Sequence, residues 1–297
     1  MTQKEQHMKA LNNFAERVKK DPNVVALMVY GSLAYGDVWK RSDIDVELIV
    51  RDGAVYNEKS FYTLIEDGVE INMSSFSEVS KFKRYIQKVR NGFDLGLFGK
   101  GNIAFSKDEE LIRMFDDARN IGEDDAPKAF AGALWGLINW MHKAEKWVTI
   151  YDNPLYSQRF LQMAASITAD LELIRNRENP TRESILRALE LNPKLMNEVY
   201  VIPSTTVMTA DDVRRTIQIL DDYIMEHMEW WSRHILRFLS DGEVKTASHI
   251  INQCGYAPLF YLVEKGIIQE TTEPSRLFKK SNLTVDEAAY FYIKEDF

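Results

Sequence analysis

The sequence predicts an α+β protein, in which a mixed sheet flanked by helices is followed by a mainly helical segment and a small mixed unit. Two short apolar runs rich in β-branched residues, at 24–30 and 46–50, are typical of buried strands. An acidic, turn-forming stretch at 122–127 separates them from long segments with apolar residues at helical spacing. A chain of 297 residues can bury more than one core, so we expect three domains, at 1–121, 122–241 and 242–297.

The first domain is expected to alternate helices and strands around one sheet. Its opening helix has apolar residues at helical spacing from Met8 to Val18, and Asp21-Pro22-Asn23 ends it. The expected series is a helix at 6–20, strands at 24–30 and 46–50, a short helix at 59–66, a strand at 69–74, an amphipathic helix with a basic outer face at 76–90, a strand at 102–105 and a helix at 109–118.

A Gly-Ser pair and two aspartates lie between the first two strands. Gly31-Ser32 interrupts the first apolar run, and Ser42-Asp43-Ile44-Asp45 follows ten residues later. Because side chains alternate along a strand, Asp43 and Asp45 share one face while Ile44 points into the core. Two carboxylates on the same face of a strand are close enough to repel each other unless a cation binds between them. Mg²⁺ is commonly held by one or two carboxylates together with substrate phosphates, and a glycine-serine turn lets the backbone approach a phosphate.

The pattern of Gly-Ser, followed ten residues later by Asp-Ile-Asp within a strand, resembles a known signature. It is that of the polymerase-β-type nucleotidyltransferase superfamily, particularly its aminoglycoside and lincosamide nucleotidyltransferases. The resemblance implies a nucleotidyltransferase sheet and transfer of a nucleoside monophosphate from an NTP, with ATP as the expected nucleotide. The acceptor would be a hydroxyl of a small, antibiotic-like molecule, and pyrophosphate would be released. It also implies that Asp43 and Asp45 are catalytic Mg²⁺ ligands and that Gly31, Ser32 and Ser42 bind the nucleotide.

The superfamily usually has a third carboxylate on the strand expected at 69–74, where it binds the catalytic metal and helps to activate the acceptor. Alignment by eye places Asn72 at that position, beside the nucleotide, and an amide is neither an anionic ligand nor a base. Glu70 lies on the same face two residues upstream and could supply the catalytic, metal-binding carboxylate, unless it is simply an exposed strand residue. Glu47, which continues the face of Asp43 and Asp45, is a third candidate.

The second domain is expected to be a helical bundle on the acceptor side of a cleft. Tryptophans 135, 140, 147, 230 and 231 all fall in it, either as bundle core or, for some, as lining of that cleft. The resemblance implies a catalytic base on its first helix, at a position that falls on His142, with Glu145 three residues further along the same face. Both are alternatively surface residues of a charged helix. The expected helices are 128–150, 158–175, 182–191 and 211–239.

The last segment is similar to a winged-helix unit. Helices are expected at 246–254 and 258–264, then a strand from Ile267, a hairpin turn at Glu273-Pro274-Ser275 and a final helix at 285–294. From Asp241 onward the chain has six lysines and arginines against nine acidic residues. Because DNA-binding surfaces are normally basic, and Arg276, Lys279 and Lys280 form only a small basic group, we expect a packing or homodimerisation module.

Composition excludes several classes of protein. Hydrophobic residues make up 45% and charged residues 28%, as in ordinary soluble proteins. The net charge of −8 argues against a nucleic-acid partner held by a broad basic surface, and favours a cationic or neutral acceptor. No apolar run has the length of a membrane span or the character of a signal peptide, so a cytoplasmic protein is expected. The single cysteine, Cys254, is expected to be a buried small hydrophobe.

Three alternatives to small-molecule modification follow from the same residues. Antitoxin-like members of the superfamily adenylylate proteins. Asn72 and the winged-helix-like tail would also suit a nucleotide-sensing regulator that has lost catalysis. A purely structural adaptor would bind no nucleotide.

Overall fold

The computed structural model describes residues 2–36, 38–55, 61–89, 101–278, 280 and 282–293. The chain forms two compact units. Unit 1 comprises Met1–Arg90 and Asp94–Ile121, and unit 2 comprises Asn91–Phe93 and Gly122–Phe297. The separation of 122–241 from 242–297 stays a prediction. Residues 59, 60, 90 and 294 of the predicted helices, and Lys279 of the small basic group, lie outside the described residues.

Unit 1 is built on a five-stranded sheet in the order β3-β4-β2-β1-β5. Strand β2 pairs antiparallel with β1 and parallel with β4, so the sheet is mixed, as predicted. The elements are α1 (Gln3–Val18), β1 (Val24–Tyr30), α2 (Gly31–Tyr35), β2 (Ile44–Val50), β3 (Tyr62–Glu66), β4 (Val69–Glu78), α3 (Val79–Val89), β5 (Asn102–Ser106) and α5 (Glu109–Asp117).

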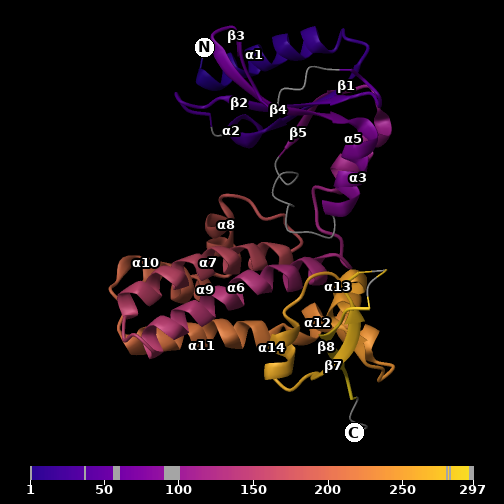
Figure 1. Ribbon diagram of the computed structural model, residues 1–297. Coiled ribbons are helices and arrows are strands. Elements are labelled where there is room, and N and C mark those ends of the chain that lie inside the picture. Colours follow the sequence, from indigo (N-terminus) through magenta and orange to yellow (C-terminus); the bar gives the residue numbers. More distant parts are fainter. Residues whose placement is uncertain are drawn as a thin grey trace. The chain divides into compact units, whose positions relative to one another are not determined.

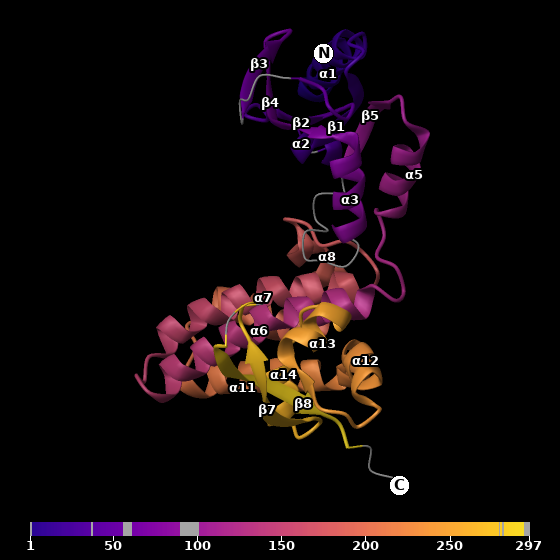
Figure 2. The ribbon, with the colours of Figure 1, turned by 45° about the vertical axis from the view of Figure 1, so that its right-hand side comes forward.

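Helix α1 covers one face of this sheet, while α3 and α5 lie on the other side (Figures 1 and 2). Leu11 and Phe14 of α1 belong to one apolar core with Val29, Val46 and Ile71 of the three central strands. Each large side chain buried there contributes about 1.5–3 kcal/mol. Because strand side chains alternate, polar residues of β2 and β4 are directed to the opposite face of the sheet.

Two predicted helices of unit 1 were wrong in part. In the segment expected as a helix at 59–66, residues 62–66 form β3, which pairs with β4. The strand expected at 69–74 runs on to Glu78, so the helix expected from residue 76 begins at Val79. The parallel pairing with β2 continues to Ile49↔Ser77 and Val50↔Glu78, and these backbone hydrogen bonds outweigh the helical spacing of the apolar residues.

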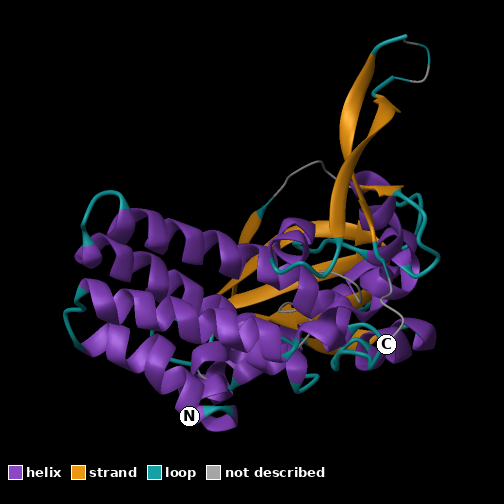
Figure 3. Cartoon of the chain, turned by 90° about the horizontal axis from the view of Figure 1, so that it is seen from below, coloured by secondary structure: helices purple, strands orange, loops and turns teal. Residues whose placement is uncertain are grey.

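Unit 2 contains long helices that lie side by side (Figures 1 and 3). The helix expected at 211–239 is broken at His227, whose φ of −105° and ψ of 6° interrupt the helical hydrogen bonds. The carbonyl of Ile224 instead accepts the indole N–H of the buried Trp231, at 3.1 Å. The main helices are α6 (Ala126–Thr149), α7 (Pro154–Arg175), α8 (Ser184–Leu191), α11 (Ala210–Glu226) and α12 (Met228–Leu239).

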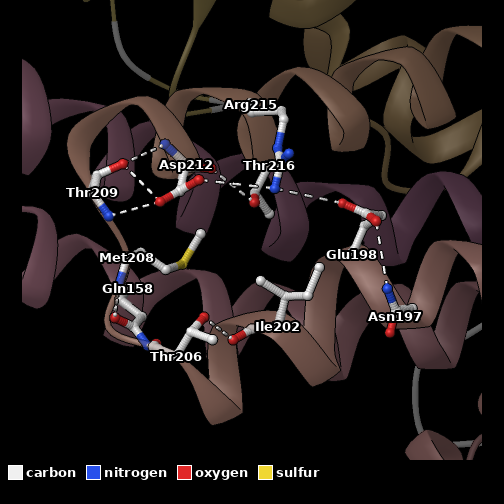
Figure 4. A network of polar contacts seen from close by, with 10 residues as sticks. All are labelled: Gln158, Asn197, Glu198, Ile202, Thr206, Met208, Thr209, Asp212, Arg215 and Thr216. Carbon is white, nitrogen blue, oxygen red and sulfur yellow. Dashed lines mark hydrogen bonds and ion pairs between the residues drawn. The ribbon is translucent and has the colours of Figure 1, made fainter.

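The segment between α8 and α11, which the sequence did not predict to be helical, forms three short turns of helix. They are α9 (Pro193–Met196), a π-helix (Asn197–Val201) and α10 (Ile202–Thr205). Gln158 of α7 fastens the end of this segment, because its amide donates to Thr206 O at 2.7 Å and accepts the N–H of Met208 at 3.1 Å (Figure 4). Helix α11 then begins with a capping box between Thr209 and Asp212.

The end of the chain has the order of a winged-helix unit: β6 (Lys245–Thr246), α13 (Ala247–Cys254), α14 (Leu259–Glu264), β7 (Gln269–Arg276) and β8 (Thr284–Phe291). Its sheet has the order β6-β8-β7. The expected final helix is therefore wrong, because that segment is the central strand and buries Ala289 and Tyr290. The turn expected at Glu273 to Ser275 is also wrong, since these residues pair with β8 inside β7.

Other predictions about single residues have mixed outcomes. Trp231 is 1% exposed and belongs to the core, whereas Trp135 is 48% exposed and its ring is nearly perpendicular to those of Tyr256 and Phe260. Cys254 is buried, as expected. Among the described residues, none of the helices combines the length and the apolar character that crossing a membrane requires.

Candidate functional site

The Gly-Ser bend follows directly from the central strand β1. This strand ends at Tyr30 and the short helix α2 begins at Gly31, whose φ is +69°. A Cβ atom placed on Gly31 would lie 2.5 Å from Asp45 Oδ2, which is closer than atoms can approach. The carboxylate of Asp45 therefore lies against the bend, and only glycine satisfies both the backbone angle and the available space.

The two aspartates lie at the start of β2, beside β4. Asp45 is opposite Tyr30 of β1 and Asn72 of β4 in the strand register. Asp43 comes one residue before the strand, and its Oδ2 accepts a hydrogen bond from Asn72 Nδ2 at 2.7 Å. Ile44 between them is fully buried. The aspartates thus share the face opposite the α1 core, as strand alternation predicted.

Asn72 is the residue that the alignment by eye places at the superfamily's third carboxylate, and it lies on β4 beside Asp43. Its amide nitrogen donates to Asp43 and also to Glu70 Oε1, at 3.3 Å. Its oxygen accepts the hydroxyl of Thr63 on the neighbouring strand β3, at 3.1 Å. Glu70 is exposed and lies in hydrogen-bond contact with Asn72, so it belongs to the same polar group. Thr63 was not anticipated, because its approach depends on the β3–β4 pairing and leaves no trace in the local sequence.

Glu47 lies further along the same face of β2 but is enclosed. The hydroxyl of Tyr30 donates to it at 3.3 Å, and Ser77 donates to its other oxygen. Burial raises the pKa of Glu47, and these two hydrogen bonds counteract the increase only in part. The third candidate carboxylate is therefore held by two hydroxyl groups within the sheet.

The loop before the aspartates is fixed by contacts with Ser42. Its hydroxyl accepts the backbone N–H of Trp39 at 3.1 Å, and its carbonyl oxygen lies 2.9 Å from Nε2 of the buried His7 on α1. Ser42 thus shapes the loop that presents Asp43. His7 was missed, because the contact joins residues far apart in the sequence. A cavity of about 290 Å³ next to this loop has Lys40, Asp43 and Glu70 in its lining.

His142 and Glu145 lie in unit 2, on α6. Both are exposed, and both line a separate cavity of unit 2 that is bounded by α6, α11 and α14. Their suggested action on the acceptor hydroxyl stays a prediction.

The donor set of unit 1 fits a magnesium-nucleotide better than a bare metal ion. Across the described ranges, no three or more His, Cys, Asp or Glu side chains are arranged to hold a metal. Asp43 and Asp45 offer carboxylate oxygens on one face, beside a bend at which Gly31 has no side chain. Mg²⁺ commonly takes one or two carboxylates and completes its shell with phosphates and water.

Comparison with known proteins supports the predicted family and fold. Residues 12–110, which include every candidate of unit 1, match the family model described as polymerase beta, nucleotidyltransferase. The chain is similar in fold to a solved nucleotidyltransferase-like protein from Exiguobacterium sibiricum 255-15, with a TM-score of 0.62 and 12% identity over 96% of this chain and 99% of that one. A search of curated proteins gives no match. Unit 1 of this chain is therefore a nucleotidyltransferase domain of the polymerase-β type.

Proposed function

We propose that this protein transfers a nucleoside monophosphate from an NTP, with ATP as the expected nucleotide, to a hydroxyl of a small acceptor. One observation carries the proposal: Asp45 lies against the Gly31 bend while Asp43 lies on the same face, at the hydrogen-bonded end of β2 and β4. This arrangement brings together the oxygen ligands of a cation and a backbone segment that a triphosphate can approach closely.

Each residue has a defined part in the proposed reaction. Asp43 and Asp45 would hold Mg²⁺, and the Gly31-Ser32 bend would position the phosphates. When bound, Mg²⁺ supplies polarisation of the acceptor oxygen and neutralisation of the charge on the leaving group. The acceptor oxygen forms a bond to the α-phosphorus, the bond from that phosphorus to the bridging oxygen breaks, and pyrophosphate leaves.

The proton of the acceptor hydroxyl needs a base, and Asn72 is not one. Glu70 is the first candidate, since Asn72 links it to Asp43 through hydrogen bonds. His142 and Glu145 are the further candidates from unit 2, and both types of side chain can act as general bases. The net charge of −8 supports a cationic or neutral acceptor, such as an antibiotic-like molecule.

The test is incubation with each α-labelled NTP and Mg²⁺, with and without a panel of hydroxylated amines. Label on a small molecule, together with pyrophosphate release, is the expected result. Label on protein would instead support protein adenylylation. The double substitution Asp43→Asn with Asp45→Asn should abolish transfer while the circular dichroism spectrum stays unchanged, and full activity in that variant would refute the assignment.

A second candidate, a nucleotide-binding regulator without catalysis, is favoured by one observation. The amide of Asn72, which the alignment by eye places where the superfamily usually has an anionic ligand, donates to Asp43. The winged-helix order of the C-terminal segment is compatible with such a role. This candidate predicts that calorimetry detects binding of a non-hydrolysable NTP, that no NTP is turned over, and that DNA is retained at physiological salt.

A further inference from the structure

The second turn of α1 contacts the backbone that leads into Asp43. His7 is 2% exposed, and its Nε2 atom lies 2.9 Å from the carbonyl oxygen of Ser42. Because a carbonyl oxygen can only accept a hydrogen bond, Nε2 is the donor in this contact. The accepting oxygen belongs to the peptide group that joins Ser42 to Asp43. His7 therefore holds the backbone directly before the first aspartate of the site.

The helix side of this contact is fixed by its own hydrogen bonds. A capping box between Thr2 and Glu5 closes the first turn of α1, so the helix is ordered from its first residues. The second ring nitrogen of His7, Nδ1, lies 2.9 Å from the carbonyl oxygen of Gln3, one turn back in the same helix. The imidazole ring is thus oriented by α1 before it reaches the loop.

The loop side borders open space. Ser42 closes a tight turn with Trp39, since its backbone N–H donates to Trp39 O at 2.9 Å and its hydroxyl accepts the N–H of Trp39 at 3.1 Å. The cavity of about 290 Å³ beside this loop has His7, Ser42 and Asp43 in its lining. Packing against side chains does not enclose the turn where it borders this cavity, so the hydrogen bond from α1 determines its position there.

Asp43 is consequently held at two points. Its carboxylate accepts the amide of Asn72 at 2.7 Å, and the peptide group before it is held by His7. Ligand groups of a binding site must be kept within about 0.5 Å of their working positions. We propose that His7 is a positioning residue of the nucleotide site, which sets the place of the Asp43 carboxylate through Ser42. The identity of the ligand, a magnesium-nucleotide, rests on the proposed function.

Two substitutions separate the contacts of the two ring nitrogens. In His7→Gln the side-chain amide can take the place of Nε2 and keep the bond to Ser42. In His7→Asn the shorter amide can take only the place of Nδ1, so it keeps the bond to Gln3 and loses the loop. Both variants lose the aromatic ring. A role of His7 in packing alone would therefore affect them alike, and urea unfolding of both measures that shared effect.

Hydrogen–deuterium exchange of nucleotide-free protein tests the contact itself. In His7→Asn we expect segment 38–45 to exchange at least about tenfold faster than in the wild type, because a lost buried hydrogen bond favours local opening. In His7→Gln its exchange should stay near the wild-type rate, and helix α5 should be unchanged in both variants. Equal exchange of segment 38–45 in the two variants would overturn the proposal. If His7→Asn does not fold, His7→Leu replaces it, since leucine fills the site without a donor.

Calorimetric titration with ATP and Mg²⁺ tests the consequence for the site. We expect His7→Asn to bind the nucleotide at least several-fold more weakly than His7→Gln, whose affinity should be close to that of the wild type. Equal affinities of the two variants would contradict a positioning role. If the wild-type protein binds no nucleotide, the proposed function fails, and the exchange rates of segment 38–45 still decide whether His7 holds the backbone before Asp43.

Discussion

Asn72 Nδ2 donates a hydrogen bond to Asp43 Oδ2 at 2.7 Å, and Asn72 Oδ1 accepts one from Thr63 at 3.1 Å. The two contacts orient the amide, so that a donor rather than an acceptor faces the first aspartate. In the absence of a cation, this hydrogen bond holds Asp43 beside Asp45 without adding a third negative charge. Asn72 therefore stabilises the site when no cation is bound. For a cation that binds there, it supplies one anionic ligand fewer than an aspartate at this position would.

Asn72→Asp should make the stability of unit 1 depend on Mg²⁺. The substitution replaces the hydrogen bond with two facing carboxylates, so we expect a loss of about 1–3 kcal/mol in the free energy of unfolding without metal. Millimolar Mg²⁺ should recover most of this loss, because it binds the folded state preferentially. Urea unfolding with and without Mg²⁺ measures both effects. Thr63→Val, which removes a hydrogen bond but adds no charge, should show no gain from Mg²⁺.

Gly31→Ala should disrupt the site more than an equivalent change elsewhere. Gly31 and Gly53 have nearly the same φ, +69° and +71°, but an added Cβ meets Asp45 at 2.5 Å in the first and nothing within 4 Å in the second. Both substitutions impose the backbone cost of a left-handed residue, about 1–2 kcal/mol. Only Gly31→Ala should also displace Asp45. Calorimetric titration with ATP and Mg²⁺ is expected to show binding lost in Gly31→Ala and kept in Gly53→Ala; equal losses would exclude a specific role for the bend.

The aspartate pair could be predicted because its geometry is local. Strand alternation alone relates Asp43 to Asp45, and the buried Ile44 between them is apolar for the same reason. The contacts that orient the pair could not be predicted in this way. Thr63 and His7 reach the site through β3–β4 pairing and through packing of α1, and neither relationship is visible in a window of sequence.

The incorrect helices show where tertiary contacts outweigh local pattern. Residues 285–291 include two alanines and fit a helical spacing, but strands on both sides supply hydrogen bonds that only an extended segment can satisfy. The break at His227 lacks glycine or proline, so no local signal marks it. It follows from the burial of Trp231, whose indole needs the carbonyl of Ile224 as an acceptor.

Asp170→Asn should stabilise the protein at neutral pH. Burial raises the pKa of Asp170 from its usual 3.8 to about 6, and a hydrogen bond from Ser184 opposes this only in part. Between these two pH values, the folded protein keeps a proton that the unfolded chain releases, so stability falls as the pH rises through this range. The charged carboxylate of Asp170 therefore lowers the free energy of unfolding by at most about 3 kcal/mol, at about 1.4 kcal/mol for each pKa unit.

Urea unfolding at pH 4 and pH 7.5 checks this expectation. The variant should match the wild type at the lower pH and exceed it at the higher one. Glu229→Gln, which removes a carboxylate from an exposed position, should give no such difference. A variant that is less stable than the wild type at pH 7.5 would contradict the assignment of an unfavourable buried charge to Asp170.

His227 should produce a pH dependence of the opposite sign. Burial is the largest cause of its lowered pKa; Arg175 lowers it further, while Glu226 and Glu172 act in the other direction. Its Nδ1 atom is buried and has no hydrogen-bond partner among the described residues. Because the unfolded chain takes up the proton first as the pH falls below about 6.5, acidification through this range favours unfolding.

His227→Phe isolates this contribution. A phenyl ring can keep the stacking on Phe130, whose ring centroid lies 6.1 Å away with planes 10° apart, but it cannot take up a proton. Between pH 7 and pH 5.5, the free energy of unfolding should fall less in this variant than in the wild type. In Asp170→Asn it should fall more, since the stabilising protonation of Asp170 is absent. Parallel pH profiles for the wild type and His227→Phe would show that the uncharged imidazole of His227 does not contribute to the acid sensitivity of unit 2.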